Sequence, residues 1–190
     1  MNAAVSTQPR KLKLATVSLA GCFGCHMSFL DLDEFLFDLA EKVDVVYSPV
    51  GSDAKLYPEA VDVCLVEGAV ANEDNLELAL LLRQHTAMVI SFGDCAISAN
   101  VPGLRNLWVG TEAVLDRSYL ELADQGGQYP HEPGIVPELL PKVRPLHEVI
   151  PVDLYLPGCP PSAERIRLAI APLLVGEKPL MKGSAMLRFG

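Results

Sequence analysis

The sequence has no long apolar run and no recognisable export signal. No stretch approaches the ~18 consecutive apolar residues that a membrane-spanning helix needs, which argues against direct insertion into a membrane. Residues 1–13 are polar and then basic, no apolar segment follows them, and there is no twin-arginine signal. We therefore expect a cytoplasmic protein. Disulfides are rare in that compartment, so the five cysteines are expected to be thiols or metal ligands.

Positive charge is also scarce. The chain has 15 Lys and Arg against 24 Asp and Glu, and the resulting net charge of −9 argues against nucleic acid as a partner. Its 15 prolines and 14 glycines indicate many turns but no disorder, because half of the residues are hydrophobic. The length of 190 residues fits one domain with a full core.

What is present is an alternation of strands and helices. Short apolar runs predict strands over residues 12–19, 43–47, 61–66, 87–92 and 152–156. Helical spacing and capping residues predict helices over residues 27–42, 73–85 and 160–176, the last one kinked or ended early by Pro172. This order predicts an α/β fold built on a parallel sheet.

Four of the cysteines follow predicted strands, each in a turn that contains Gly or Pro. Cys22 and Cys25 follow the first strand, Cys95 follows the fourth and Cys159 follows the fifth. The carboxyl ends of parallel strands form the binding crevice of such a sheet, so these cysteines are predicted to meet at one edge. Four thiolates that converge from separate loops are what a 4Fe–4S cluster needs.

The first pair has the spacing Cys-x-x-Cys, which alone fits a zinc half-site, a thioredoxin-like redox pair or two cluster ligands. A structural zinc site usually draws its ligands from two local pairs, and there is no second Cys-x-x-Cys. The remaining two cysteines are far away in the sequence, which suits a buried cluster on a rigid sheet better. A cluster is therefore the favoured interpretation, with zinc and a redox disulfide as alternatives.

Glycines next to the cysteines are candidates for a supporting role. They would let backbone N–H groups approach the sulfurs and would permit positive φ angles. The glycines concerned are Gly21, Gly24, Gly93 and Gly158. Ordinary turn glycines are the alternative, which explains any one of them more easily than all four.

Two ionisable residues are expected beside the same site. Glu67 ends the third strand and is a candidate to hydrogen-bond a cluster loop, to carry protons or to ligate iron in an oxidised cluster. His26 directly follows Cys25 and is a candidate hydrogen-bond donor or proton carrier. A surface carboxylate and a structural histidine are the respective alternatives. Cys64 lies in the middle of a strand, where a buried and inert thiol is expected.

Residues 101–151 interrupt the alternation. They are rich in Pro and Gly and have weak periodicity, apart from a predicted helix over 111–123. We interpret them as an irregular insertion that contacts a partner, with a flexible surface insertion as the alternative. Trp108 is expected to be a core or interface anchor. The expected organisation is a flexible N-terminus (1–10), a cluster-binding core (11–100), this insertion (101–151) and a strand–loop–helix unit that completes the site (152–190).

Taken together, these residues resemble the small subunits of nickel–iron hydrogenases, most closely the soluble, NAD-reducing bidirectional kind. The Pro-Gly-Cys-Pro-Pro segment is highly specific. The motifs lie in order along nearly the whole chain: Ala20-Gly-Cys-Phe-Gly-Cys-His-Met-Ser28, Leu30-Asp-Leu-Asp-Glu34, Glu67-Gly68, Phe92-Gly-Asp-Cys-Ala96, Asn100-Val-Pro102 and Leu156-Pro-Gly-Cys-Pro-Pro-Ser-Ala163.

The resemblance implies a flavodoxin-like domain that holds one proximal 4Fe–4S cluster on Cys22, Cys25, Cys95 and Cys159. It implies a large-subunit partner that carries the nickel–iron centre and splits hydrogen, and diaphorase subunits that bind flavin and NAD. The sequence leaves open whether a second flavin, FMN, binds near the cluster. NAD rests on the resemblance alone, because the chain has no Gly-x-Gly-x-x-Gly fingerprint.

The alternative is the cluster-bearing subunit of a complex I-type quinone oxidoreductase. That family has two adjacent cysteines in its first motif, whereas Phe23 and Gly24 separate Cys22 from Cys25 here. Membrane-bound and periplasmic hydrogenase small subunits carry further cysteines and a histidine for two more clusters, and these are not found after Cys159. We therefore expect a hydrogenase subunit with a single cluster.

Overall fold

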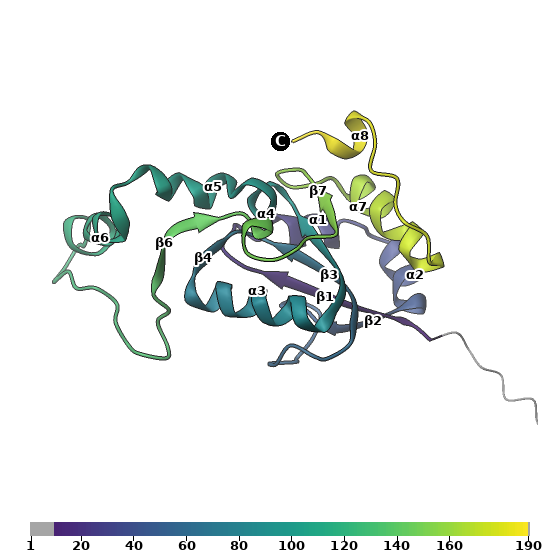
Figure 1. Ribbon diagram of the computed structural model, residues 1–190, viewed down its shortest axis with the longest axis horizontal. Helices are drawn as coiled ribbons and strands as arrows, with labels where there is room; N and C mark the ends of the chain where they lie inside the picture. The colour runs from purple at the N-terminus through teal and green to yellow at the C-terminus, as the bar shows by residue number, and fades with distance from the viewer. Residues whose placement is uncertain (1–9, 190) are drawn as a thin grey trace, which may run out of the picture.

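The computed structural model describes residues 10–189 as a five-stranded parallel sheet covered by helices (Figure 1). The strand order is β2-β1-β3-β5-β7, with β1 (Leu12–Ser18), β2 (Val43–Tyr47), β3 (Val61–Glu67), β5 (Thr86–Phe92) and β7 (Leu154–Leu156). This order changes direction between β1 and β3, as in flavodoxin-like folds, so the expected fold class is confirmed. Most of the predicted flexible N-terminus, residues 1–9, lies outside the described residues.

Two apolar cores sandwich the sheet. Leu14, Leu65 and Ile90 belong to the core on one face, and Ala15 and Val89 belong to the core on the other. The helices that supply these cores are α1 (Gly24–Leu30), α2 (Phe35–Lys42) and α7 (Ala163–Ile170) on the first face, and α3 (Glu73–His85) on the second. Both faces are covered, which explains why the central strands read as continuous apolar runs and do not alternate.

The prediction of one continuous helix over residues 27–42 is wrong. The structure divides it into α1 and α2, which are joined by a turn at residues 31–34. Asp33 takes a positive φ of 48° in that turn, a conformation that Asp tolerates better than most residues. The break turns the chain so that α1 stays beside the first cysteine loop while α2 covers the sheet further away.

Residues 101–151 are more ordered than expected. They contain part of α5 (Asn100–Gly103), then η1 (Leu104–Leu107), α6 (Gly110–Leu115), a π-helical turn η2 (Asp116–Glu121), β6 (Leu139–Arg144) and η3 (Leu146–Glu148). The predicted helix over 111–123 is thus α6 with its π-helical continuation. β6 pairs antiparallel with β4 (Val70–Asn72), a ribbon that the sequence pattern missed because Pro141 lies in one strand and the other has three residues.

Residues 100–144, which we call the lobe, project sideways from the sheet (Figure 1). At the other end of the chain, the predicted helix over 160–176 ends early, as Pro172 indicated: α7 gives way to a 3-10 turn, η4 (Ala171–Val175). α4 (Asp94–Ser98) follows β5, and α8 (Ser184–Leu187) is the last helix within residues 10–189. Within residues 10–189, no helix has both the length and the apolar character needed to cross a membrane.

Candidate metal centre

One small pocket lies where the sequence predicted the cysteines to meet. It is lined by Cys22, Gly24, Cys25, Glu67, Gly68, Asp94, Cys95, Gly158, Cys159 and Pro160, which come from the loops after β1, β3, β5 and β7. Cys25 is buried, Cys95 is half-buried, and Cys22 and Cys159 are exposed. The parallel arrangement therefore brings all four cysteines to one edge of the sheet, with the pocket open towards the surface.

The backbone around the cysteines leaves no room for larger residues. Gly93 has a φ of 84°, and a Cβ atom built on it would lie 2.2 Å from Sγ of Cys25. Gly158 has a φ of 143°, and its Cβ would lie 2.4 Å from Cα of Pro161. Gly21 and Gly24 do not take positive φ angles; instead Phe23, between the first two cysteines, adopts a φ of 67°. The prediction of positive φ therefore holds for Gly93 and Gly158 only.

The loop that carries Cys159 is fastened to two neighbouring elements. The N–H of Gly158 donates to Oδ1 of Asp94 at 2.6 Å, and the N–H of Asp94 donates to the carbonyl oxygen of Gly158 at 2.9 Å. Oγ of Ser28, on α1, donates to the carbonyl oxygen of Pro161 at 2.5 Å. These bonds hold all three cysteine loops in one arrangement. Asp94 and Ser28 were not singled out in the sequence, although both lie inside motifs that carry the resemblance.

Two donors reach the cysteine sulfurs from α5. Nδ2 of Asn100 lies 3.4 Å from Sγ of Cys159, and the backbone N–H of Val101 hydrogen-bonds to Cys95. Such donors stabilise negative charge on sulfur. Sequence reasoning assigned this role to the glycines and missed Asn100, for which the Asn100-Val-Pro102 motif was the available signal.

His26 and Glu67 form a buried pair beside the pocket. They are 1% and 2% exposed, and Oε2 of Glu67 accepts from the backbone N–H of His26 at 2.8 Å and lies 2.5 Å from its Nδ1. The His26 ring stacks on Phe23 with the ring centroids 4.5 Å apart. Its Nε2 has no hydrogen-bond partner among the described residues. Glu67 is thus no surface carboxylate: it ties the first cysteine loop to the end of β3.

The electrostatics of the pocket favour a positively charged occupant. Burial raises the pKa of Cys25, and the charges of Glu67, Cys95, Cys22 and Cys159 raise it further. Burial also raises the pKa of Cys95, although the N–H of Val101 acts against it. No Lys or Arg is found among the described residues that line the pocket. Four thiolates and a carboxylate would repel one another here unless a cationic core bound them, so the donor set fits an iron–sulfur cluster.

The arrangement differs from a compact site for one ion. Among residues 10–189, no three His, Cys, Asp or Glu side chains are grouped so that they could hold a single metal ion. Cys64, which we expected to be inert, is fully buried in the core between the sheet and α3 and does not line the pocket. Burial raises the pKa of its thiol to about 12.

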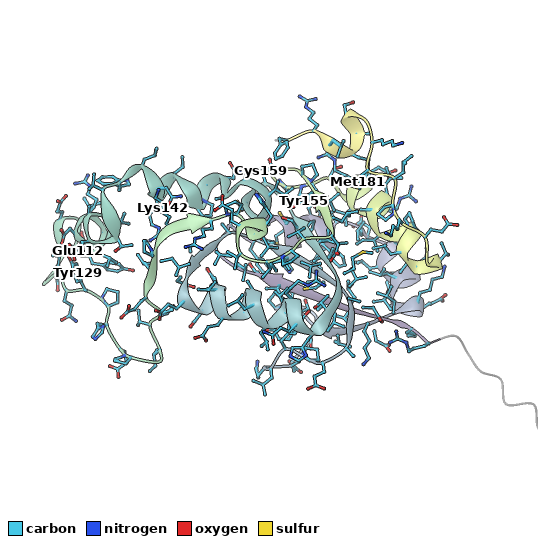
Figure 2. The ribbon with its side chains drawn as sticks, viewed as in Figure 1. Glu112, Tyr129, Lys142, Tyr155, Cys159 and Met181 are labelled. Carbon is cyan, nitrogen blue, oxygen red and sulfur yellow. The ribbon has the colours of Figure 1, made fainter. Side chains whose placement is uncertain are left out.

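An exposed apolar surface begins at Val101, whose backbone N–H bonds to Cys95. It follows α5, η1 and the two residues after η1 and consists of Val101, Leu104, Leu107, Trp108 and Val109, which we call the apolar ridge; the exposed fractions run from 53% at Trp108 to 94% at Val109. Trp108 was expected to be a core or an interface anchor, and its exposed side chain shows that it is not a core residue; a role at an interface stays a prediction. In the view of Figure 2, Cys159 lies between the lobe, marked by Lys142, and the C-terminal segment, marked by Met181.

Comparison with known proteins identifies the family. Residues 22–173 match the family model described as NADH ubiquinone oxidoreductase, 20 Kd subunit. The chain belongs to this family. Within the 20 kDa subunit family it is similar to hydrogenase subunits: a chain of the crystal structure of an NAD+-reducing NiFe hydrogenase in the H2-reduced state superimposes with a TM-score of 0.88 and 41% identity, covering 95% of this chain and 100% of that chain.

Two curated relatives point the same way. The delta subunit of the NAD-reducing hydrogenase HoxS from Cupriavidus necator is 36% identical over 94% of this chain and 86% of the relative. One subunit of the F420-non-reducing hydrogenase from Methanothermobacter thermautotrophicus is 42% identical over 88% of this chain and 55% of the relative. The chain thus spans little more than half the length of the archaeal relatives. These findings confirm the predicted resemblance to nickel–iron hydrogenase small subunits.

Proposed function

We propose that this chain is the electron-transfer small subunit of a nickel–iron hydrogenase and binds one 4Fe–4S cluster through Cys22, Cys25, Cys95 and Cys159. The observation that carries the proposal is the pocket in which these four cysteines, from three separate strand ends, meet at one edge of the sheet. The bound cluster would supply one-electron transfer between the hydrogen-splitting partner and a flavin module.

The chain's own residues would hold and tune that group. Gly93 leaves the space that Sγ of Cys25 occupies, and the Asp94 and Ser28 hydrogen bonds fix the Cys159 loop. The donors on Asn100 and Val101 would stabilise negative charge on the sulfurs. Glu67 and His26 would hold the first cysteine loop, and their buried polar atoms offer a place for a proton beside the cluster.

The surface around the pocket supports a large protein partner. Cys22 and Cys159 are exposed, and the apolar ridge beside them presents several large side chains to solvent. A surface of this kind usually marks a protein–protein contact. We assign the pocket rim and the apolar ridge to the contact with a nickel–iron large subunit, and we place flavin- and NAD-binding diaphorase subunits further along the electron path in a cytoplasmic complex.

The location of the pocket also bears on FMN. In a flavodoxin-like sheet the ligand binds outside the strand ends at the point between β1 and β3 where the strand order reverses. The loop of residues 20–26 and the end of β3 occupy this place here, with two cysteines, His26 and Glu67. We therefore assign FMN to the flavin module of the complex and not to this chain.

The description of the family model favours a second candidate, the cluster subunit of a quinone oxidoreductase. Such a subunit would share the fold and the pocket but would work without a nickel partner. The spacing of Cys22 and Cys25 and the similarity to hydrogenase subunits support the first candidate.

The deciding experiment is anaerobic purification with any co-purifying subunits, followed by iron, sulfide, nickel, zinc and flavin analysis and electron paramagnetic resonance. About four irons and four sulfides per chain, as expected for one cubane, with nickel in a co-purifying subunit, would support the hydrogenase assignment. Iron without nickel would favour the quinone oxidoreductase. Zinc without iron would overturn both, and FMN bound to the isolated chain would overturn its assignment to the partner.

A further inference from the structure

One arginine attaches the Cys159 loop to a segment much further along the chain. Arg165 lies in the first turn of α7, where Oγ of Ser162 accepts from its backbone N–H. Its Nη1 donates to the carbonyl oxygen of Pro157 at 2.6 Å and to that of Arg188 at 2.8 Å. Its Nε donates to the carbonyl oxygen of Ala185 at 2.7 Å. A single guanidinium therefore joins the cysteine loop, α7 and the segment that contains α8.

The acceptors explain why arginine is suited to this position. The carbonyl groups of Ala185 and Arg188 lie at the C-terminal end of α8, where a helix leaves its carbonyls without internal partners. A guanidinium presents several donors in a fixed plane, so it can serve these carbonyls and that of Pro157 at once. Lysine carries the same charge, but its single nitrogen cannot reproduce this planar arrangement.

The segment around α8 has one further anchor. Met186 is 5% exposed and belongs to the same core as Ile166 and Leu173. Its neighbours Leu187 and Phe189 stay exposed. In Figure 1, α8 lies beyond α7 on the side of the molecule that carries the loop after β7. One buried side chain and one guanidinium thus hold a short helix in contact with the cysteine loop.

We propose that Arg165 is a positioning residue that locks residues 184–188 onto the Cys159 loop, so that release of this segment loosens the loop. The lock follows from the hydrogen bonds alone, whereas its effect on a cluster rests on the proposed function. Asp94 and Ser28 hold the same loop from α4 and α1, and Arg165 adds a connection to an element outside the pocket. Through this connection a change at the exposed surface of α8 would reach Pro157, two residues before Cys159.

The lock is tested by hydrogen exchange of the purified full-length chain, with the matched variants Arg165→Gln and Arg167→Gln. Both remove one positive charge from α7, but within residues 10–189 the side chain of Arg167 bonds only to Glu164. Arg165→Gln should speed exchange at the amides of Gly158 and Cys159 and, together with them, at those of residues 184–188, whereas Arg167→Gln should change neither. Arg165→Lys should resemble Arg165→Gln. Faster exchange in only one of the two segments would overturn the lock.

The effect on the cluster is tested separately by the rate at which a ferrous chelator removes iron under anaerobic conditions. Arg165→Gln should release iron about tenfold faster, the factor that corresponds to losing one hydrogen bond to a charged group. Met186→Ala should act in the same direction, and the double variant should be less than additive because both changes free the same segment. A rate equal to that of Arg167→Gln would overturn the effect on the cluster.

The two failures remain distinguishable. A wild-type chain that contains no iron would contradict the proposed function, and the exchange experiment would still decide whether Arg165 locks the two segments. Conversely, a cluster-bearing chain whose exchange is unchanged in Arg165→Gln would keep the proposed function and reject the lock.

Discussion

The amino ends of the parallel strands lie along one side of the sheet and the carboxyl ends along the other, and we call these sides the amino edge and the carboxyl edge. The two differ in whether their charged groups have partners of opposite charge. At the amino edge two carboxylates meet a cation: Asp62 accepts from Nη2 of Arg10 at 2.7 Å, and Asp153 accepts from Nη1 of Arg83 at 2.7 Å. At the carboxyl edge, Glu67 and four thiols meet with no Lys or Arg among the described residues that line their pocket. The pKa of both aspartates is lowered, whereas the pKa of Cys25 is raised.

This difference in charge pairing indicates that the amino edge contributes to stability and that the carboxyl edge serves binding. At the amino edge, Asp62 and Asp153 have cationic partners within the chain. The carboxyl edge concentrates groups that become mutually repulsive once they ionise, and such an edge is favourable only when a cationic group completes it. The comparison therefore predicts that substitutions at the carboxyl edge change metal content, and that substitutions at the amino edge change the free energy of unfolding alone.

The largest effect is expected from Cys25→Ser. This cysteine is the most buried of the four, and if the chain binds the proposed cluster of about four irons, replacing Cys25 should remove nearly all of them. Cys64→Ser is the matched control, because Cys64 is also buried but lies in the core on the other side of the sheet. Iron and sulfide analysis of both variants measures the difference. Loss of iron from Cys64→Ser would show that the four ligands are wrongly chosen.

Gly93→Ala should come next. Gly93 and Gly110 both have positive φ angles, 84° and 83°, so alanine strains the backbone at either position. At Gly93 the ψ of 164° places the residue in a region that is essentially restricted to glycine, where the strain is about 1–3 kcal/mol. Only at Gly93 would the new methyl group meet Sγ of Cys25, since no atom lies within 4 Å of it at Gly110. Gly93→Ala should therefore lose most of its iron while Gly110→Ala retains it. Equal iron contents would mean that the pocket yields more easily than the structure indicates.

The sequence predicted this edge because its signals are local. An apolar run ends, a Gly- or Pro-containing turn follows, and Cys22, Cys95 or Cys159 lies in that turn. Parallel strands then place the turns together without further information. The five strands and the cap at Asn72 were predictable for the same reason, since Oδ1 of Asn72 accepts from the N–H of Asn75 three positions away.

Other features depend on contacts between distant residues and left no such signal. Asn100 reaches Cys159 only because the chain turns back after α4, where Ala99 takes a φ of 62°. The break at Asp33 interrupts an otherwise regular helical pattern, and Trp108 is exposed although its size favours burial. The conformation and exposure of these residues are set by tertiary packing or by a partner, and local propensity does not encode either.

A smaller effect is expected from Asn100→Ala, which removes the side-chain donor to Cys159. Asn100 takes a positive φ of 25°, so alanine also strains the first residue of α5. Donors of this kind favour the reduced, more negative state, so the midpoint potential should fall. A hydrogen bond worth about 1 kcal/mol corresponds to roughly 40 mV for one electron. Asn106→Ala is the control, because its side chain bonds to the backbone of Val143 and not to a sulfur. Redox titration followed by paramagnetic resonance would measure both, and equal potentials would count against the Asn100 contact.

The smallest effect is expected at the amino edge, from Asp153→Asn. Asparagine keeps an acceptor for the N–H of Val89 and removes the charge that faces Arg83. The Asp153 side chain is 44% exposed, so solvent screens the pair and the loss should be about 0.5–1 kcal/mol of unfolding free energy. Iron content should stay unchanged, because this edge lies at the opposite end of the strands from the cysteines.

The pH dependence of this loss supplies its own check. Burial alone would raise the pKa of Asp153, but the N–H of Val89 and the charge of Arg83 outweigh it and lower the pKa. The stabilisation is therefore complete above the unfolded value of about 3.9 and disappears as the pH falls through the lower folded value. Denaturant unfolding should show a constant difference between wild type and Asp153→Asn near neutral pH, and a shrinking difference below about pH 4. A difference that persists in acid would mean that Asp153 acts through packing, and the contrast between the two edges would then not be one of charge.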